Sequence, residues 1–337
     1  MKLLVIRLSA IGDIVLTTPV LRCLKKQLPQ AELHYLVEPA YKEVLAHNPY
    51  IDVLHQTEHN WLTTIHELKS ENFDRIIDLQ NNKDTQSLAT ALQVPVSAVQ
   101  QHAFKKAIYT RLKWNVMPQT HVVDRYFQTI APLGVKNDGA GLDYFIPRLE
   151  EVPFKDIPAS HHAGFIALVI GASFFTKRLP VEQWKALCAS IQHPLILLGG
   201  PAEREAGAAI QEIDPIKIYN ACGKFSLNES ADLLRKSKLV VAQDTGLMHI
   251  AAAFKKPIIT IWGSTTPALG MTPYFGNHFL QGKGLPPYEA VQVYSLWCRP
   301  CTTAGRHQCP QGHFKCMRQI DVGEIALKVQ ARLQAAR

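Results

Sequence analysis

The chain alternates short apolar, β-rich runs with segments whose apolar residues recur at helical spacing. The run KLLVIRL at residues 2–8 precedes Leu21, Leu24 and Leu28, and FDRIIDLQ at residues 73–80 precedes DTQSLATAL. Helices that follow strands in this order cover both faces of a parallel sheet. The alternation therefore predicts an α/β protein and excludes all-helical and all-β folds.

The alternation occurs twice, on either side of a proline-containing segment at residues 144–162 that has no regular period. A chain of 337 residues is also long for one hydrophobic core. Two doubly wound domains are expected, with a ligand cleft at the carboxyl ends of their strands. The predicted division is an N-terminal domain at 1–150, a linker at 151–162, a C-terminal domain at 163–320 and a C-terminal helix at 321–337.

The net charge of +8 is concentrated in the second half of the chain, where 20 Lys and Arg face 13 Asp and Glu. This excess suits an anionic ligand or an acidic membrane face, although a solvated surface explains it equally well. No basic run with interleaved aromatics and no helix-turn-helix or zinc-finger spacing is present, so no nucleic-acid partner is expected. Arg7 interrupts the first apolar run early, and no run approaches the ~18 residues of a membrane span. We therefore expect a cytoplasmic protein.

The stretch VAQDTGLMHIAAAF at residues 241–254 places polar residues where a strand turns into a helix. The first N–H groups of a helix and its positive dipole end bind anions. Gly246 allows the backbone to approach a phosphate, Thr245 offers a hydroxyl, and His249 lies one turn further on. Asp244 suits a ribose hydroxyl or orients the loop. The alternative is that Asp244 or Thr245 only caps the helix.

Two further strand ends of the second half carry candidate ligands. Lys177, in IGASFFTKRLP at residues 170–180, could neutralise a departing diphosphate, and its alternative is an ordinary exposed lysine. Glu203 follows Gly199-Gly200 at the next strand end and could reach a base or ribose. An ordinary surface carboxylate is equally consistent with Glu203.

The stretch RLSAIGDIVLTTP at residues 7–19 places a carboxylate near the first helix. Gly12 permits a tight turn, and Asp13 follows at a position where a helix end favours negative charge. Asp13 is either a helix cap or a general base, and the residues leave both open. The chain has no P-loop and no G-x-G-x-x-G fingerprint, which disfavours a dehydrogenase, and no Asp-x-Asp pair for a divalent metal.

Four motifs together resemble a known family. They are VIRLSAIGDIVLTTPVLRCLKKQLP, DLQ at 78–80, DTGLMHIAAA, and CRPC…CP…HFKCM near the C-terminus. From Met1 to about Asp321 the chain is similar to the bacterial ADP-heptose:lipopolysaccharide heptosyltransferases, glycosyltransferase family 9. The resemblance implies a GT-B fold, two Rossmann-like domains facing across a cleft, and an inverting, metal-independent transfer of heptose from ADP-heptose. The acceptor would be a lipid-anchored lipopolysaccharide core at the cytoplasmic face of the inner membrane, with peripheral membrane contact.

By motif, the resemblance also implies roles for individual residues. Asp13 would be the base, Ser9 and Gly12 would lie beside the donor diphosphate, and Ser173 and Lys177 would be phosphate ligands. The ADP site would consist of Asp244, Thr245, Gly246, Leu247 and His249.

The acceptor side departs from the family pattern. Asn81-Asn82-Lys83 follow the DLQ motif where family members often have Gly. Lys83, Lys105 and Arg111 are candidates for acceptor phosphates or carboxylates, although exposed basic side chains are the simpler interpretation. The sequence does not identify the acceptor sugar. Two alternative functions also remain: a GT-B transferase with another nucleotide sugar, and a non-catalytic sugar-nucleotide-binding protein.

Four cysteines cluster near the C-terminus with the spacing C-x2-C-x7-C-x6-C, at Cys298, Cys301, Cys309 and Cys316. Four thiols in a short segment can hold zinc tetrahedrally. A related group of autotransporter heptosyltransferases, which this segment resembles, implies an iron site instead. Such a metal would be structural, and catalysis is expected to need no cofactor. The alternative is a set of reduced, partly buried thiols.

Overall fold

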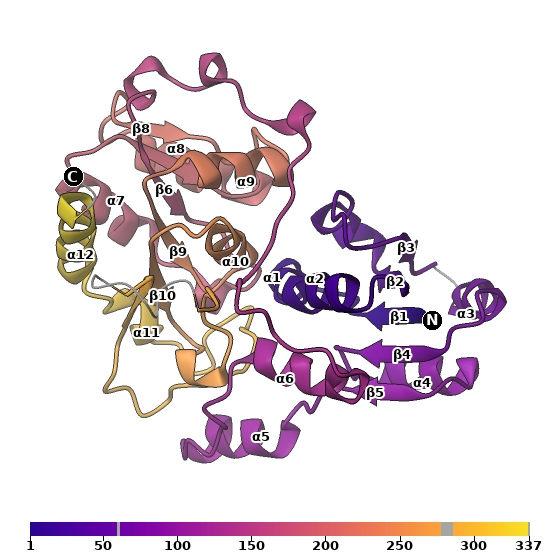
Figure 1. Cartoon of the computed structure of the whole chain (residues 1–337). Helices are drawn as coiled ribbons and strands as arrows, with labels where there is room; N and C mark the ends of the chain where they lie inside the picture. The colour runs from indigo at the N-terminus through magenta and orange to yellow at the C-terminus, as the bar shows by residue number, and fades with distance from the viewer. Residues whose placement is uncertain (59–60, 278–285, 336–337) are drawn as a thin grey trace. The chain divides into compact units, whose positions relative to one another are not determined.

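The computed structural model describes residues 1–58, 61–277 and 286–335, and these form two compact units (Figure 1). The first unit comprises Met1–His102, Thr120–Phe145 and a short segment that begins at Tyr274. The second comprises Ala103–Gln119, Ile146–Pro273 and the C-terminal part of the chain. Each unit contains one parallel sheet, and each is described separately below.

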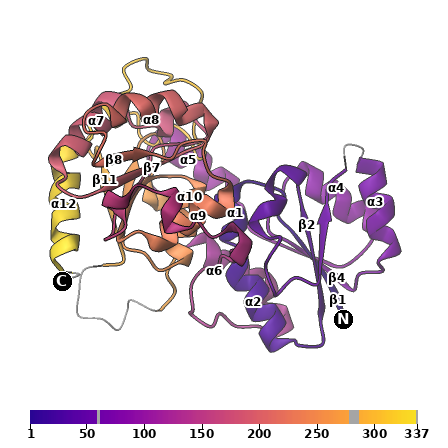
Figure 2. The same ribbon diagram turned by 90° about the horizontal axis from the view of Figure 1, so that it is seen from above.

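The first unit is a five-stranded parallel sheet with the order β3-β2-β1-β4-β5. Its strands are β1 (Lys2–Ile6), β2 (Glu32–Val37), β3 (Val53–Gln56), β4 (Arg75–Asp78) and β5 (Val96–Ala98). Its helices are α1 (Ile11–Val15), α2 (Thr18–Gln27), α3 (Trp61–Ser70), α4 (Lys83–Leu92) and α6 (Val122–Ile130). Leu4 and Ile6 of β1 share one buried cluster with Leu68 of α3 and Leu88 of α4. Side chains alternate along a strand, so the residues between them supply the opposite face, where α2 and α6 lie (Figure 2).

A buried arginine connects α2 to the last part of the first unit. The Arg22 side chain, 3% exposed, donates to both carboxylate oxygens of Asp138 at 2.8 Å, pairs with Asp143 and donates to the Gly141 carbonyl. The hydrogen bond from Arg22 is the main reason why the pKa of Asp138 falls from 3.8 to about 2. The ion pairs therefore stabilise the fold only while these carboxylates are ionised.

Replacing this arginine is expected to destabilise the protein in a pH-dependent way. In Arg22→Met, two carboxylates lose their cation, and the free energy of unfolding near neutral pH should fall by roughly 3 kcal/mol. Because the pKa of Asp138 is lower in the folded state, its contribution is present above pH 4 and is lost as the pH falls toward 2. Urea unfolding at neutral pH and across this acid range should show a flatter pH dependence for the variant.

The matched control for this prediction is Lys25→Met, on the same helix. Lys25 pairs with Asp52 at the surface, with 26% and 34% of the two side chains exposed. An exposed pair contributes about 1 kcal/mol or less, so this variant should lose little stability. Equal losses in both variants would contradict the special role of Arg22.

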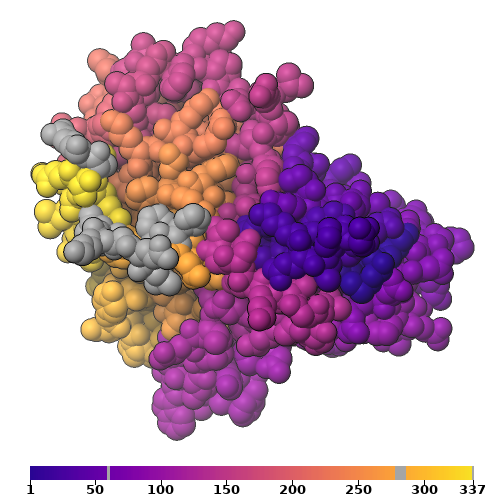
Figure 3. All heavy atoms as spheres, in the orientation of Figure 1, coloured from indigo at the N-terminus to yellow at the C-terminus, as the bar shows by residue number. Residues whose placement is uncertain are grey.

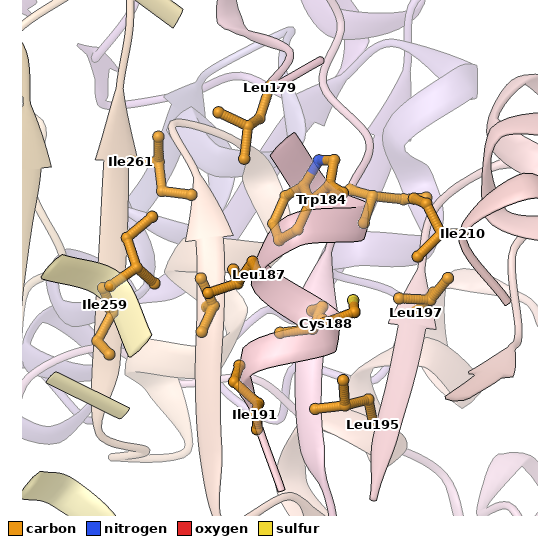
Figure 4. Close-up of a cluster of buried hydrophobic side chains, with 14 of the residues drawn as sticks. Leu179, Trp184, Leu187, Cys188, Ile191, Leu195, Leu197, Ile210, Ile259 and Ile261 are labelled. Atoms are coloured by element: carbon orange, nitrogen blue, oxygen red, sulfur yellow. The ribbon is translucent and has the colours of Figure 1, made fainter. Parts of the chain in front are cut away.

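The second unit is a six-stranded parallel sheet with the order β11-β10-β9-β6-β7-β8. Its strands are β6 (Ile166–Val169), β7 (Leu195–Leu198), β8 (Ile218–Asn220), β9 (Leu239–Gln243), β10 (Ile258–Trp262) and β11 (Tyr288–Gln292). Its helices are α5 (Ala103–Leu112), α7 (Val181–Ser190), α8 (Arg204–Gln211), α9 (Leu227–Lys236), α10 (Gly246–Ala253), α11 (Lys315–Arg318) and α12 (Val322–Ala335). Trp184 and Leu187 of α7 and the following Ile191 pack with strand residues such as Leu197 and Ile259 to form its main core (Figure 4). Helix α12 contacts α7, β9 and β10, whereas α9 and α10 contact each other.

The alternation of strands and helices is confirmed, but several local features differ from the sequence prediction. Residues 39–44 form a 3-10 helix that begins at Pro39, where the pattern YKEVLAHN at residues 41–48 suggested a regular helix. The helices α5 and α6 and the short strands β5 and β11 were not predicted, and α5 belongs to the second unit. Residues expected as a linker form 3-10 turns after Pro153 and Pro158, and the Val152 N–H donates to Asp232 of α9 at 2.8 Å. Most of this segment therefore packs as part of the second unit.

Candidate active site

Asp13 lies in the first turn of α1, and its carboxylate is paired with an arginine. Ala10 is the residue at the helix cap, so the alternative in which Asp13 caps the helix is wrong. Asp13 Oδ1 lies 2.6 Å from Arg7 Nη2, and 25% of the Asp13 side chain stays exposed. Arg7 is further held by the carbonyls of Ser9 and Leu79, at 2.9 and 3.0 Å. The carboxylate is thus oriented by a fixed cation while part of it remains accessible.

The DLQ motif supports the same loop from the neighbouring strand. Gln80 Oε1 accepts hydrogen bonds from the N–H groups of Leu8 at 2.8 Å and Ser9 at 3.4 Å. Asp78 is buried, and its carboxylate accepts from the N–H groups of Gln80 and Asn81 at 2.9 and 2.7 Å. Burial raises the pKa of Asp78, and the hydrogen bonds counteract that rise. The motif therefore fixes the loop that precedes Asp13, which explains why the two stretches occur together.

A polar cavity of about 580 Å³ lies at the carboxyl edge of the first unit's sheet. Its lining comprises Leu8, Glu38, Pro39, Gln56, Thr57, Glu58, Trp61, Asn82 and Asp84. Burial raises the pKa of Glu38, and the charge of Asp84 adds to the rise. Lys83, a candidate acceptor ligand, is exposed beside Asn82 and Asp84 at the start of α4. The other two candidates, Lys105 and Arg111, lie on α5 of the second unit and are also exposed.

In the second unit, Lys177 and Asp244 are brought together. Lys177 Nζ lies 2.8 Å from Asp244 Oδ2, with 15% and 13% of the two side chains exposed. The Thr265 hydroxyl donates to the same carboxylate oxygen at 2.7 Å. Asp244 follows β9 and Thr265 follows β10, so the ends of neighbouring strands are tied to the loop that carries Lys177. A cation is thereby fixed next to the start of α10.

The residues after Asp244 form the start of helix α10. Thr245 occupies the cap position, but its side chain makes no capping hydrogen bond, so the capping alternative is wrong for Thr245. Gly246 and Leu247 are half-buried in the first turn, and His249 is 3% exposed. The exposed side of the turn therefore consists of Thr245, Gly246 and Leu247, and His249 lies behind them in the helix.

The remaining predicted ligands of this unit lie in the loops around that strand end. Ser173 is exposed after β6. Glu203 is 9% exposed; it accepts from the Gly200 N–H at 3.0 Å and lies 3.4 Å from an Arg178 guanidinium nitrogen. Glu203 thus supports the turn after β7, and its nucleotide-binding role stays a prediction.

Two polar side chains that the sequence did not single out, Gln243 (buried) and Arg299 (partly buried), hold this region together. Gln243 accepts from the Leu179 N–H at 2.7 Å and donates to the Ile170 carbonyl at 2.8 Å, which fixes the loop before α7. Arg299 donates to the carbonyls of Thr265 at 2.8 Å and Trp262 at 3.3 Å. Burial lowers the pKa of Arg299. The segment that carries the cysteines therefore supports the loop that contacts Asp244.

The four C-terminal cysteines do not form the tetrahedral set considered from their spacing. Among the described residues, no three of their sulfur atoms lie within 4.8 Å of one another. Burial raises the pKa of Cys301, and that of Cys316 to about 12. Cys298 Sγ lies 3.8 Å from His313 Nε2. The residues fit the alternative of reduced, partly buried thiols, and neither zinc nor iron is supported by their arrangement.

A different group has closely spaced metal-ligand atoms within the described part of the chain. His34, His55 and Glu71 of the first unit have ligand atoms within 4.8 Å of one another. His34 Nδ1 and His55 Nε2 are 2.7 Å apart and share a hydrogen bond, and burial together with His34 lowers the pKa of His55. Lys2 Nζ lies 2.8 Å from the Glu71 carboxylate and would compete with a cation. The side chains of His34, His55 and Glu71 therefore form a polar cluster near the edge strand β3.

The comparison with protein-family models identifies the family of this chain. The model described as glycosyltransferase family 9 (heptosyltransferase) matches residues 61–293, more than half of the chain. The chain belongs to glycosyltransferase family 9. It is accordingly a glycosyltransferase, and the resemblance drawn from the motifs is confirmed.

Individual relatives of this family 9 transferase cover most of its length. Lipopolysaccharide heptosyltransferase 1 of Pseudomonas aeruginosa is 26% identical over 306 residues, covering 82% of this chain and 82% of that protein. The Escherichia coli K12 protein of the same name is 25% identical over 295 residues, covering 80% and 90%. The solved family 9 transferase of Veillonella parvula has a TM-score of 0.76 at 21% identity, covering 99% and 97%. The E. coli heptosyltransferase WaaC with ADP has a TM-score of 0.68 at 19% identity, covering 98% and 100%. These structures confirm the predicted α/β class with two Rossmann-like domains of the GT-B type.

The sequence did not predict three contacts of the candidate site. They involve Arg7 beside Asp13, Thr265 beside Asp244, and Gln243 below the loop of Lys177. A signal for Thr265 exists, because Ser264-Thr265-Thr266 directly follow the strand β10 at the edge where ligands of parallel sheets bind. Arg7 satisfies the same rule because it directly follows β1, whereas Gln243 is the last residue of the apolar strand β9 and carries no such signal.

Proposed function

We propose that this family 9 transferase moves heptose from ADP-heptose to a sugar hydroxyl of a lipopolysaccharide core. The names of the relatives from P. aeruginosa and E. coli support this activity, as does the ADP bound in the solved WaaC structure. The observation that carries the proposal is the Lys177–Asp244 pair next to the start of α10. A lysine ammonium and free helix N–H groups at one strand end are the features that bind a diphosphate.

In this proposal the second unit supplies most of the donor contacts, and Ser9 and Gly12 of the first unit supply the others. The diphosphate lies against the first turn of α10, where Thr245 offers its hydroxyl and Gly246 allows close approach of the backbone. Lys177 approaches the diphosphate as a cation that Asp244 and Thr265 hold in place. Ser9, Gly12, Ser173, Glu203, Leu247 and His249 remain proposed donor contacts on the evidence of their motifs.

The chemical step is an inverting displacement. The acceptor oxygen attacks the anomeric carbon opposite to the ADP, and the bond to the diphosphate oxygen breaks as the new glycosidic bond forms. Asp13 accepts the hydroxyl proton during attack, because an aspartate is too weak a base to ionise an alcohol beforehand. The negative charge that develops on the departing ADP is stabilised by Lys177 and the helix N–H groups. In this scheme the protein's own groups suffice and the transfer is metal-independent.

The acceptor and the cellular location are part of the same proposal. A lipid-anchored core would present its sugars at the cytoplasmic face of the inner membrane, so we place the transferase there with peripheral contact. Among the described residues, no helix combines the length and apolar character of a membrane span. Lys83 lies between Asn82 and Asp84 in the chain, two residues that line the polar cavity of the first unit, and this supports Lys83 as an acceptor candidate.

Nucleotide preference and sugar transfer test this function together. Titration calorimetry should show ADP binding at least about tenfold more tightly than UDP or GDP, the contribution of one well-made hydrogen bond. ADP-heptose with truncated lipopolysaccharide cores should then give a product heavier by one heptose in mass spectrometry. A clear preference for UDP or GDP would favour the other nucleotide sugars. ADP binding without transfer to any core would favour the non-catalytic alternative.

A further inference from the structure

Helix α5 and the residues that follow it form an exposed segment of unusual composition. None of the ten residues of α5 is buried, and the side chains of Phe104 and Leu112 are 77% and 56% exposed. Trp114, two residues beyond the helix, is 68% exposed. The segment lies at the molecular surface in Figures 1 and 3. Large apolar side chains that gather in contact with water commonly mark a surface that binds something.

The apolar residues of α5 lie on one face. Phe104, Ile108 and Leu112 recur every four residues, which places them one above another on the helix. Lys105 and Arg111 flank this row on its two sides and are both exposed. The exposed face is therefore an apolar row between two cations.

The charged residues along this part of the sequence have one sign. Between Asp84 and Asp124 the sequence contains four Lys and Arg and no Asp or Glu. In the part of the chain that the structure describes, no carboxylate pairs with Lys105 or Arg111. Lys113 has a different role, because its ammonium donates to the Pro300 carbonyl at 2.9 Å and attaches the segment to the second unit. The outward cations are thus available for an anionic partner.

We propose that residues 103–116, here called the docking segment, bind the surface of an anionic phospholipid bilayer. An apolar row between cations on a short surface helix lies in the interface of such a bilayer, with Phe and Leu in the acyl boundary and the cations at the headgroups. Tryptophan at the end of the row suits the same depth, because its ring is apolar and its N–H is polar. The proposal rests on the proposed function only in that a lipid-anchored acceptor gives the surface a use. It assigns to this segment the membrane contact that the acceptor requires.

Vesicle flotation with the full chain tests the docking segment. The protein should float with vesicles of phosphatidylcholine and phosphatidylglycerol, and much less with phosphatidylcholine alone. Lys105→Gln/Arg111→Gln should weaken binding about 30-fold, at roughly fivefold for each cation near an anionic surface. Phe104→Ser/Leu112→Ser should weaken it more than about tenfold, because the apolar row no longer enters the bilayer. Retained ADP binding and an unchanged melting temperature show that the variants are folded.

Matched controls separate the segment from general surface effects. Lys155→Gln/Lys238→Gln removes two other exposed cations, and Leu149→Ser/Ile216→Ser removes two apolar side chains that are 99% and 78% exposed. Both controls should float as the native protein does. Equal losses in the controls, or binding that ignores the phosphatidylglycerol content, would overturn the proposal. A change of molecular mass in lipid-free solution on Phe104→Ser/Leu112→Ser would assign the face to a second copy of the chain instead.

The vesicles contain neither donor nor acceptor, so flotation is independent of the transfer reaction. Transfer of heptose to a delipidated, soluble core is measured in parallel. Flotation without transfer would support membrane binding by the docking segment and refute the proposed function. Transfer without flotation would refute membrane binding by the docking segment and support the proposed function.

Discussion

Asp13→Asn is expected to lower kcat by about 10²–10⁴-fold, the usual contribution of a positioned general base. The asparagine oxygen can still accept a hydrogen bond from Arg7, which lies 2.6 Å from the aspartate, but it cannot take up the acceptor's proton. The carbonyls of Ser9 and Leu79 continue to hold Arg7, so the loop should keep its conformation. ADP release by the variant under saturating donor and acceptor measures the effect.

Binding and a second carboxylate provide the controls for this variant. ADP affinity should change little, because Lys177 and the start of α10 belong to the second unit and the Asn side chain leaves the loop with Ser9 and Gly12 in place. Glu67→Gln, an exposed carboxylate of α3 outside the site, should leave kcat unaltered. Turnover of Asp13→Asn at the native rate would show that another group accepts the proton. A parallel loss of ADP affinity would indicate that Asp13 contributes to the donor site instead.

The fold was predictable from the sequence because its main signal is periodic. Apolar runs such as residues 2–8 and 239–242 are too short for buried helices and end in polar turns, so they specify strands of a parallel sheet. Helix α5 was missed because its periodic signal is weak: only Phe104, Ile108 and Leu112 recur at helical spacing in a helix of ten residues. The short strand β5 has only three residues and is half-exposed, which leaves nothing for a periodicity argument to detect.

The candidate site was predictable only where residues follow strand ends. Asp244 and Lys177 satisfy that rule, and the structure places them 2.8 Å apart although 66 positions separate them in the chain. The pairing itself depends on the strand order β10-β9-β6, which a single sequence does not specify. The cysteines show the opposite case, because their spacing suits a metal whereas no three of their sulfur atoms lie within 4.8 Å of one another in the described part of the chain. The spacing of residues in the sequence identifies candidate site residues. The tertiary fold determines which of their side chains come into contact.

Lys177→Met is expected to lower kcat by about 10²–10³-fold, as is common when one group that stabilises a developing charge is removed. The effect should appear in turnover more than in donor binding, since the charge on the departing diphosphate is greatest as its bond to the sugar breaks. ADP should nevertheless bind more weakly, because one cation is lost from the diphosphate site. Lys177→Arg keeps the positive charge and should retain part of the turnover and part of the ADP affinity. Steady-state rates and calorimetry with ADP measure these changes.

The alternative to this prediction is that Lys177 only neutralises Asp244, and adenosine distinguishes the two roles. If the ammonium contacts the diphosphate, Lys177→Met should weaken ADP binding and leave adenosine binding unchanged, because adenosine has no phosphate. If the ammonium only holds Asp244, the variant should weaken both ligands equally as the turn before α10 loses its partner. Thr265 still donates to the Asp244 carboxylate in the variant, which favours a folded turn. Lys185→Met, a lysine of α7 that lies 3.5 Å from Glu182 at the surface, should change neither affinity. Equal losses for ADP and adenosine would therefore assign Lys177 a purely structural role and remove the main cation from the proposed donor site.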